Sequence, residues 1–243
     1  MKKKIIILLI LSFPTFFISQ TLNVHKNDGT IYNVAIGEID SITFTITTTC
    51  GNYVIYQGKT YNTVLIGSQC WFTKNIDVGT MLTVNSSEDD QTDNGIIEKY
   101  CYDNDIANCD TYGGLYQWNE TMQYTTTEGA QGICPSGWHI ATYEELDILY
   151  EYVGRDGNTL KATDQGSGDG VGSNTTGFSA LLAGFTYWNT GNSSGLENYT
   201  RIWGSAESGD SGKYIQMKGT SDNITIGEYN KQYGFSVRCM KNE

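Results

Sequence analysis

The chain has 243 residues, of which 15 are Lys or Arg and 27 are Asp or Glu, so its formal net charge is −12. An acidic chain without basic clusters argues against partners such as nucleic acid or an anionic membrane. The length suits one good-sized domain with a small appendage.

The N-terminus has the pattern of a secretory signal peptide over residues 1–20. Three lysines at positions 2–4 precede an uncharged apolar run, residues 5–11, and small or polar residues lie near position 20. The alternative is a membrane anchor, but the apolar run is short for a bilayer span. We therefore predict export to the periplasm, the cell surface or the medium, with no membrane span after cleavage. Cleavage would remove three lysines and no acids, taking the net charge from −12 to −15.

Six cysteines behind an export signal predict disulfides. Six cysteines allow 15 pairings. Proximity favours Cys50–Cys70 and Cys101–Cys109, which leaves Cys134–Cys239. A zinc site is disfavoured because the chain has no C-x-x-C pair and its only histidines are His25 and His139.

Residues 21–48 are predicted to be a separate β-strand segment and linker. Residues 22–26 and 30–36 alternate apolar and polar side chains around an Asn27-Asp28-Gly29 turn, which predicts a β-hairpin. Residues 41–46 are a third strand candidate. A second hairpin is expected at residues 53–56 and 60–66.

One helix is well defined in the sequence after Thr142, which with Glu145 forms a capping box. Gly154 can end that helix, and a weaker helix is expected at residues 115–122. The rest of the chain is rich in Gly, Ser, Asn and Thr and is expected to form short strands joined by long loops, at residues 178–185, 201–205, 214–217 and 234–240. This pattern predicts an α+β fold.

Five stretches carry a family resemblance, in this order: residues 58–71, 100–109, 112–118, 134–139 (Cys-Pro-Ser-Gly-Trp-His) and 233–239. They resemble the Fibrobacter succinogenes major paralogous domain, common in exported proteins of Bacteroidetes and Fibrobacteres, and assign residues 50–241 to it. The resemblance implies a C-type-lectin-like domain with one or two helices and short antiparallel strands. The family has no agreed biochemical activity to carry over.

Residues 103–110 form an acidic loop with oxygen ligands at Asp103, Asp105, Asn108 and Asp110. Hard cations such as calcium take several oxygen ligands from one loop. The glycine and closing glutamate of an EF-hand are absent. The alternative is an Asx-rich turn closed by Cys101–Cys109, so calcium is the one cofactor that we consider and no other is expected.

Aromatic and amide side chains in the second half of the domain are candidates for binding a glycan or cell-surface polymer. Sugar rings stack on exposed aromatic faces, and the candidates are Tyr187, Trp188, Asn189 and Tyr199. The alternative is that such aromatics belong to the core.

Catalysis is not expected. His139 lies beside Pro135 and Trp138 in what reads as a packed turn, and a domain whose cysteines are all paired offers no thiolate nucleophile. The sequence thus favours an exported, non-catalytic recognition or structural protein. The alternative function is an enzyme that acts on polysaccharide or cell-surface polymer through paired carboxylates.

Overall fold

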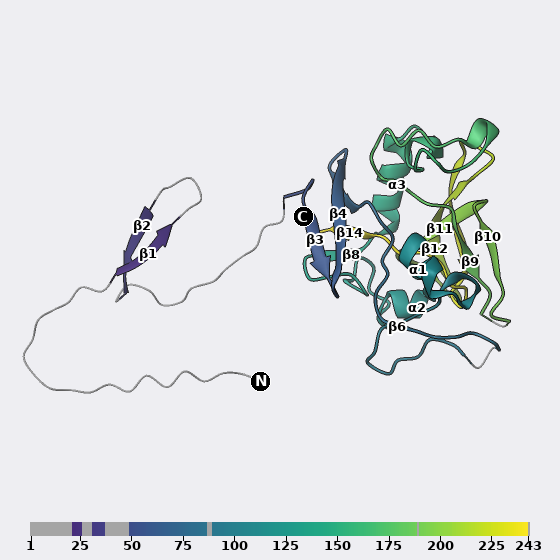
Figure 1. Ribbon diagram of the computed structural model, residues 1–243, viewed down its shortest axis with the longest axis horizontal. Coiled ribbons are helices and arrows are strands. Elements are labelled where there is room, and N and C mark those ends of the chain that lie inside the picture. The colour runs from purple at the N-terminus through teal and green to yellow at the C-terminus, as the bar shows by residue number, and fades with distance from the viewer. Residues whose placement is uncertain (1–20, 26–30, 37–48, 87–88, 189, 243) are drawn as a thin grey trace, which may run out of the picture. The chain divides into compact units, whose positions relative to one another are not determined.

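The computed structural model describes residues 21–25, 31–36, 49–86, 89–188 and 190–242 (Figure 1). By its internal contacts the chain divides into two compact units, Met1–Thr47 and Thr48–Glu243. The described part of the first unit is an antiparallel pair, β1 (Thr21–His25) and β2 (Ile31–Ala35). The predicted signal peptide, hairpin turn and third strand lie outside the described residues.

The second unit contains two five-stranded sheets. The first has the order β3-β4-β5-β14-β8, formed by Tyr53–Tyr56, Lys59–Ile66, Gln69–Phe72, Cys239–Lys241 and Trp138–Ile140. The second has the order β10-β9-β11-β12-β13, formed by Ser193–Leu196, Ala183–Thr186, Tyr199–Ser208, Ser211–Lys218 and Ile224–Asn230. A short parallel pair joins β6 (Thr80–Met81) to β7 (Glu98–Lys99).

Three short α-helices lie between the two sheets in Figure 1: α1 (Ile106–Tyr112), α2 (Trp118–Thr121) and α3 (Tyr143–Tyr152). Single 3-10 turns occur at Tyr102–Asn104, Gly157–Thr159 and Gly168–Gly170. Helix α3 has the predicted capping box, in which Thr142 Oγ1 accepts from Glu145 N at 3.1 Å and Thr142 N donates to Glu145 Oε2 at 2.7 Å. The apolar side of α3 packs into a core shared by both sheets, with Leu146 and Leu149 fully buried.

The predicted α+β, C-type-lectin-like fold is wrong: the structure is 37% strand and 16% helix, and its sheets curl into half-barrels. The error arises between residues 190 and 230, where the sequence predicts only short strands at residues 201–205 and 214–217 and long loops between them. This region forms the long antiparallel strands β11, β12 and β13. Gly212 and Gly227 lie inside these strands because a Cβ would meet the ring of Trp118 at 2.3 Å and Tyr214 Oη at 2.8 Å.

Disulfide bonding is confirmed, and the pairs are those that proximity favoured: Cys50–Cys70, Cys101–Cys109 and Cys134–Cys239. The last bridge spans 105 residues and both of its cysteines are fully buried. It holds β14, from the C-terminal end of the chain, inside the first sheet. Strand β14 pairs there with β5 on one side and β8 on the other.

Candidate functional site

Five half-buried tyrosines gather on one side of the second sheet. We call this surface the tyrosine face, and its members are Tyr187, Tyr199, Tyr214, Tyr229 and Tyr233. Side chains two residues apart on a strand share a face, so Tyr199, Arg201 and Trp203 of β11 point the same way. The registers Trp203↔Tyr214 and Gly212↔Tyr229 bring the tyrosines of β12 and β13 to that same face.

Arg201 lies at the centre of the tyrosine face. Its guanidinium carbon is 4.6 Å from the ring centroid of Tyr229, 5.2 Å from that of Tyr199 and 5.5 Å from that of Tyr214. Two buried phenylalanines, Phe185 and Phe235, complete the ring of aromatics at 5.0 and 5.1 Å. Each such contact contributes about 0.5–2 kcal/mol, depending on how dry it is. The aromatic side chains are therefore fixed in place by one shared cation.

The polar atoms of this cluster are only partly paired. Arg201 Nε donates to Gln216 Oε1 at 2.9 Å, but the buried Nη1 has no hydrogen-bond partner among the described residues. Burial raises the pKa of Tyr199 and of Tyr233 above the ordinary value for tyrosine. Their phenols therefore stay protonated at neutral pH, where a hydroxyl can both donate and accept.

Two of the four predicted ligand residues belong to the tyrosine face. The rings of Tyr187 and Tyr199 lie 4.8 and 5.7 Å from that of Phe185. Trp188 is half-buried in the turn after β9, and Asn189 lies outside the described residues. Sequence reasoning missed Arg201, Tyr229 and Tyr233, because only the strand pairing brings them beside the predicted pair.

The acidic loop is used for local structure. Asp105 caps α1 by accepting from Ala107 N at 3.0 Å, and Asn108 Nδ2 donates to Tyr102 O at 2.9 Å. Asp103 occupies the left-handed region at φ 53°, and Asp110 points to Lys59. Among the described residues, no three His, Cys, Asp or Glu side chains come close enough together to hold a metal ion. The structure thus does not bring the three aspartates of this loop to one point.

Two other residues that could serve catalysis have structural partners. His139, on β8, lies between Asn242 Oδ1 at 2.8 Å and Glu145 Oε2 at 2.9 Å. Glu120 is fully buried, which raises the pKa of its carboxyl group, and it accepts from Glu98 N at 3.0 Å and Tyr124 Oη at 2.7 Å. Glu98 and Glu120 therefore connect β7 to α2 inside the protein.

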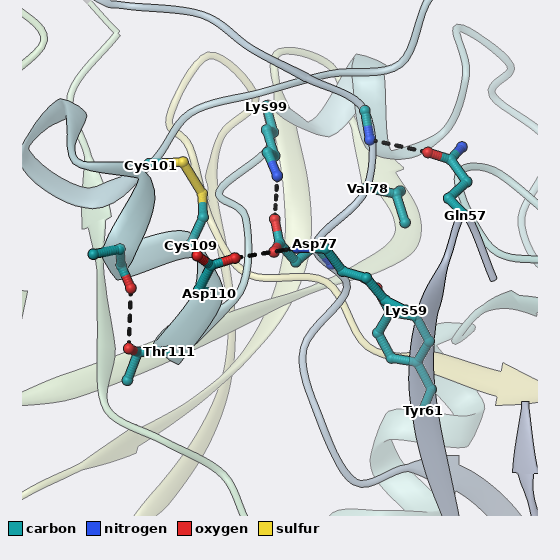
Figure 2. A network of polar contacts seen from close by, with 12 residues as sticks. Gln57, Lys59, Tyr61, Asp77, Val78, Lys99, Cys101, Cys109, Asp110 and Thr111 are labelled. Atoms are coloured by element: carbon teal, nitrogen blue, oxygen red, sulfur yellow. Dashed lines mark hydrogen bonds and ion pairs between the residues drawn. A yellow bond between two sulfur atoms is a disulfide. The ribbon is translucent and has the colours of Figure 1, made fainter. Parts of the chain in front are cut away.

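A separate cavity of about 390 Å³ lies beside β4, α1 and the segment that follows β5. Figure 2 shows the adjacent ion-pair network, in which the Asp77 carboxylate contacts both Lys99 and Lys59. Asp110 Oδ1 is 3.5 Å from Lys59 Nζ, and the Cys101–Cys109 bridge anchors the helix that carries Asp110. Burial alone would lower the pKa of Lys59, but the hydrogen bond and charge of Asp77 outweigh it, so that the pKa is raised.

These features define a β-rich, disulfide-bonded domain with an aromatic face on one sheet and a charged cavity elsewhere. The sequence model of the Fibrobacter succinogenes major domain matches residues 64–241, and the chain belongs to this family. No curated protein and no solved structure matches the chain. Within the described residues, no helix is long and apolar enough to cross a membrane.

Proposed function

We propose that this protein is an exported, non-catalytic recognition protein that binds glycans at the tyrosine face. One observation carries the proposal: five half-buried tyrosines from three strands and two flanking segments gather on one face, and three of them contact a single arginine. A glycan ring offers C–H groups to an aromatic face and hydroxyls to phenols. A surface that presents rigid rings and phenol hydroxyls side by side fits both.

Rigidity strengthens the argument. Tyrosine has few rotatable bonds, and here its rings are held by Arg201 and by Phe185 and Phe235. Because these side chains are already fixed before a ligand arrives, binding has a low entropic cost. Three disulfides and the predicted signal peptide support an oxidising location, where cell-surface and secreted glycans are found.

The test is a glycan array with the purified protein, with and without calcium, followed by titration calorimetry on the best ligand. Tyr187→Ala and Tyr233→Ala are the informative variants because both residues lie just outside the strands. Each should weaken binding about tenfold. Tyr53→Ala, at a tyrosine that is 59% exposed on β3, is the matched control and should bind like the wild type.

Trp188→Ala examines the adjoining turn. A binding loss with an unchanged melting temperature would extend the site to Trp188, whereas a lower melting temperature with unchanged affinity would make this residue structural. The proposal fails if no glycan is retained, or if the two tyrosine variants bind as well as the control. Release of shortened products from a bound polymer would instead support the enzyme alternative.

A further inference from the structure

A second site lies at the cavity beside Lys59, which shares no lining residue with the tyrosine face. Its volume of about 390 Å³ is within the range of pockets that hold small molecules. Residues from three parts of the chain line it: Lys59, Thr60 and Tyr61 of β4; 73–75 and 77 after β5; and 109–113 at the end of α1. Ser179, Leu181 and Arg238 complete the wall.

Arg238 is the most informative group in this wall. Only 1% of its surface is exposed, and burial lowers the pKa of its guanidinium to about 9. Its partners are all uncharged: Asn75 Oδ1 accepts from Nη2 at 2.9 Å and from Nε at 3.2 Å, and Phe178 O accepts from Nη1 at 2.5 Å. The ring of Phe178 lies 4.1 Å from the guanidinium carbon.

The charge of Arg238 is therefore not balanced within the described part of the chain, where no carboxylate forms an ion pair with it. A guanidinium has five N–H donors, and these contacts use three of them. A buried cation without a counter-charge is costly. An anion in the cavity would reduce that cost, so the wall of the cavity favours a negatively charged ligand.

The charged side chains of the lining carry a small excess of positive charge. Lys59, Lys74 and Arg238 line the cavity, and Lys99 contacts Asp77 from behind it. Among the described residues that line the cavity, two carboxylates, Asp77 and Asp110, stand against the three cations Lys59, Lys74 and Arg238. Lys74 is exposed and has no ion-pair partner among the described residues, so its ammonium group can reach a ligand. This excess of positive charge is local, because the chain as a whole carries −12.

The remaining polar wall is rich in hydroxyl groups. The side chains of Thr60, Thr73, Thr111, Ser179, Tyr61 and Tyr112 line the cavity. Tyr61 Oη already accepts from Asp77 N at 3.1 Å, and burial raises the pKa of Tyr61 to about 12, so its phenol remains protonated. Hydroxyl groups both donate and accept, which suits a ligand that itself carries several hydroxyls.

We propose that this cavity binds a small polyhydroxylated carboxylate, of the uronic-acid class, with the carboxylate directed to Arg238 and Lys74 and the hydroxyls to the threonine and serine side chains. Charge-assisted hydrogen bonds to a guanidinium are stronger than neutral ones, which makes the carboxylate the anchor. The site is independent of the tyrosine face. Either of the two can fail without the other.

The test is an NMR titration of the full protein with three probes. D-glucuronate carries both features, D-glucose has the hydroxyls without the charge, and acetate has the charge without the hydroxyls. We expect glucuronate to bind with a dissociation constant of about 1 mM or tighter and at least about tenfold more tightly than either other probe. The Nε–H signal of Arg238 and the backbone amides of residues 73–77 and 109–113 should shift.

Lys74→Ala is the first variant, because this exposed side chain can be removed without disturbing the core. It should weaken glucuronate binding about tenfold. The control is Lys218→Ala, at an exposed lysine on β12 outside the cavity, which should leave binding unchanged. Arg238→Lys keeps the positive charge but loses the planar guanidinium group with its paired N–H donors. The folded fraction of this variant should bind glucuronate more weakly than the wild type.

If the Arg238 variant does not fold, the shift of the Arg238 Nε–H signal in the wild-type protein still tests whether the ligand binds beside Arg238. Equal affinities for glucuronate and acetate would contradict the proposed ligand class, as would equal affinities for glucuronate and glucose. Shifts confined to the tyrosine face, or no shift with any probe, would overturn the site itself.

Discussion

The two five-stranded sheets are stabilised by different means. The first sheet takes strands from both ends of its unit, since β14 inserts between β5 and β8, and two disulfides, Cys50–Cys70 and Cys134–Cys239, join its strands and the segments beside them. In the second sheet β11, β12 and β13 follow one another along the chain, and no disulfide joins the described strands of this sheet. Two cations take that role instead: the half-buried Arg201, which contacts the aromatic rings, and the buried Lys161, which binds the backbone carbonyl of Lys218.

The difference follows from connection length. Closing a long loop costs conformational entropy before any contact forms, whereas a hairpin meander forms from local contacts. A sheet assembled from distant segments therefore gains most from a covalent link. A sheet assembled locally can rely on side chains, which leaves its surface available for a row of tyrosines.

The largest effect is expected from opening the long bridge. Cys134→Ser/Cys239→Ser removes a link that spans 105 residues, and the chain-entropy model assigns it about 5 kcal/mol of stability. The matched variant, Cys101→Ser/Cys109→Ser, opens a link of 8 residues worth about 2.5 kcal/mol. Denaturant melts of both should show the larger loss in the first pair. Equal losses would mean that loop length does not explain the stabilisation.

Lys161 is the corresponding anchor beside the second sheet. Its side chain is fully buried, and Nζ donates to Gly170 O at 2.5 Å, Lys218 O at 2.6 Å and Ser221 O at 3.0 Å. Lys161→Met keeps the length of the side chain but leaves three carbonyls without this donor, and should cost about 3 kcal/mol. Lys213→Met is the control, at a lysine paired with Glu228 near the surface, and should cost less than about 1 kcal/mol. Similar losses in the two variants would contradict the anchoring role.

How far the sequence predicts this architecture differs between the two sheets. The sequence predicts the features that depend on residues close in sequence: the capping box of α3, the hairpin strands β3 and β4, and two of the cysteine pairs. The third pair follows because two cysteines of the six remain. The sequence predicts the meander only in part, as short strands at residues 201–205 and 214–217, because Gly212 and Gly227 lie inside its strands, where large side chains cross the backbone. A glycine that admits a neighbouring ring has the same sequence signature as one that makes a turn.

The candidate sites follow the same rule. Tyr187 and Tyr199 were predicted from composition, and the structure adds Arg201 because registers across three strands bring it to them. Arg238 and Asn75, separated by 163 residues, have no local pattern that would link them. Sites made from distant segments need the pairing of strands, which a single sequence does not supply.

Removing the central cation of the tyrosine face should have a smaller effect than removing Lys161. Arg201→Met keeps the volume but loses the contacts with five rings and the hydrogen bond to Gln216, for a loss of about 2 kcal/mol. Arg201→Lys should recover part of that stability. Near-ultraviolet circular dichroism should report looser tyrosines in the Met variant. An unchanged spectrum and melt would show that the rings hold each other without the cation.

The smallest effect is expected from the His139–Glu145 pair, which joins β8 of the first sheet to α3. Burial alone would lower the pKa of His139, but its contacts with Glu145 and Asn242 outweigh burial and raise the pKa above 6.5. Burial alone would raise the pKa of Glu145, but its contacts with His139 and Thr142 outweigh burial and lower the pKa below 4.5. The histidine contribution is complete below pH 6.5 and is lost as the pH rises through its folded pKa. The glutamate contribution is complete above pH 4.5 and is lost as the pH falls through its folded pKa.

The pair should therefore stabilise the protein most between about pH 4.5 and 6.5, by about 1 kcal/mol or less because Glu145 is partly exposed. His139→Gln keeps a hydrogen-bonding side chain but cannot ionise, so the stability difference from the wild type should be largest in that window and should shrink above it. Urea melts at pH 5.5 and pH 8.5 measure this directly. Glu145 is the nearest titrating partner of His139, so Glu145→Gln should abolish most of the pH dependence of stability. If the pH dependence persists in Glu145→Gln, it belongs to another group.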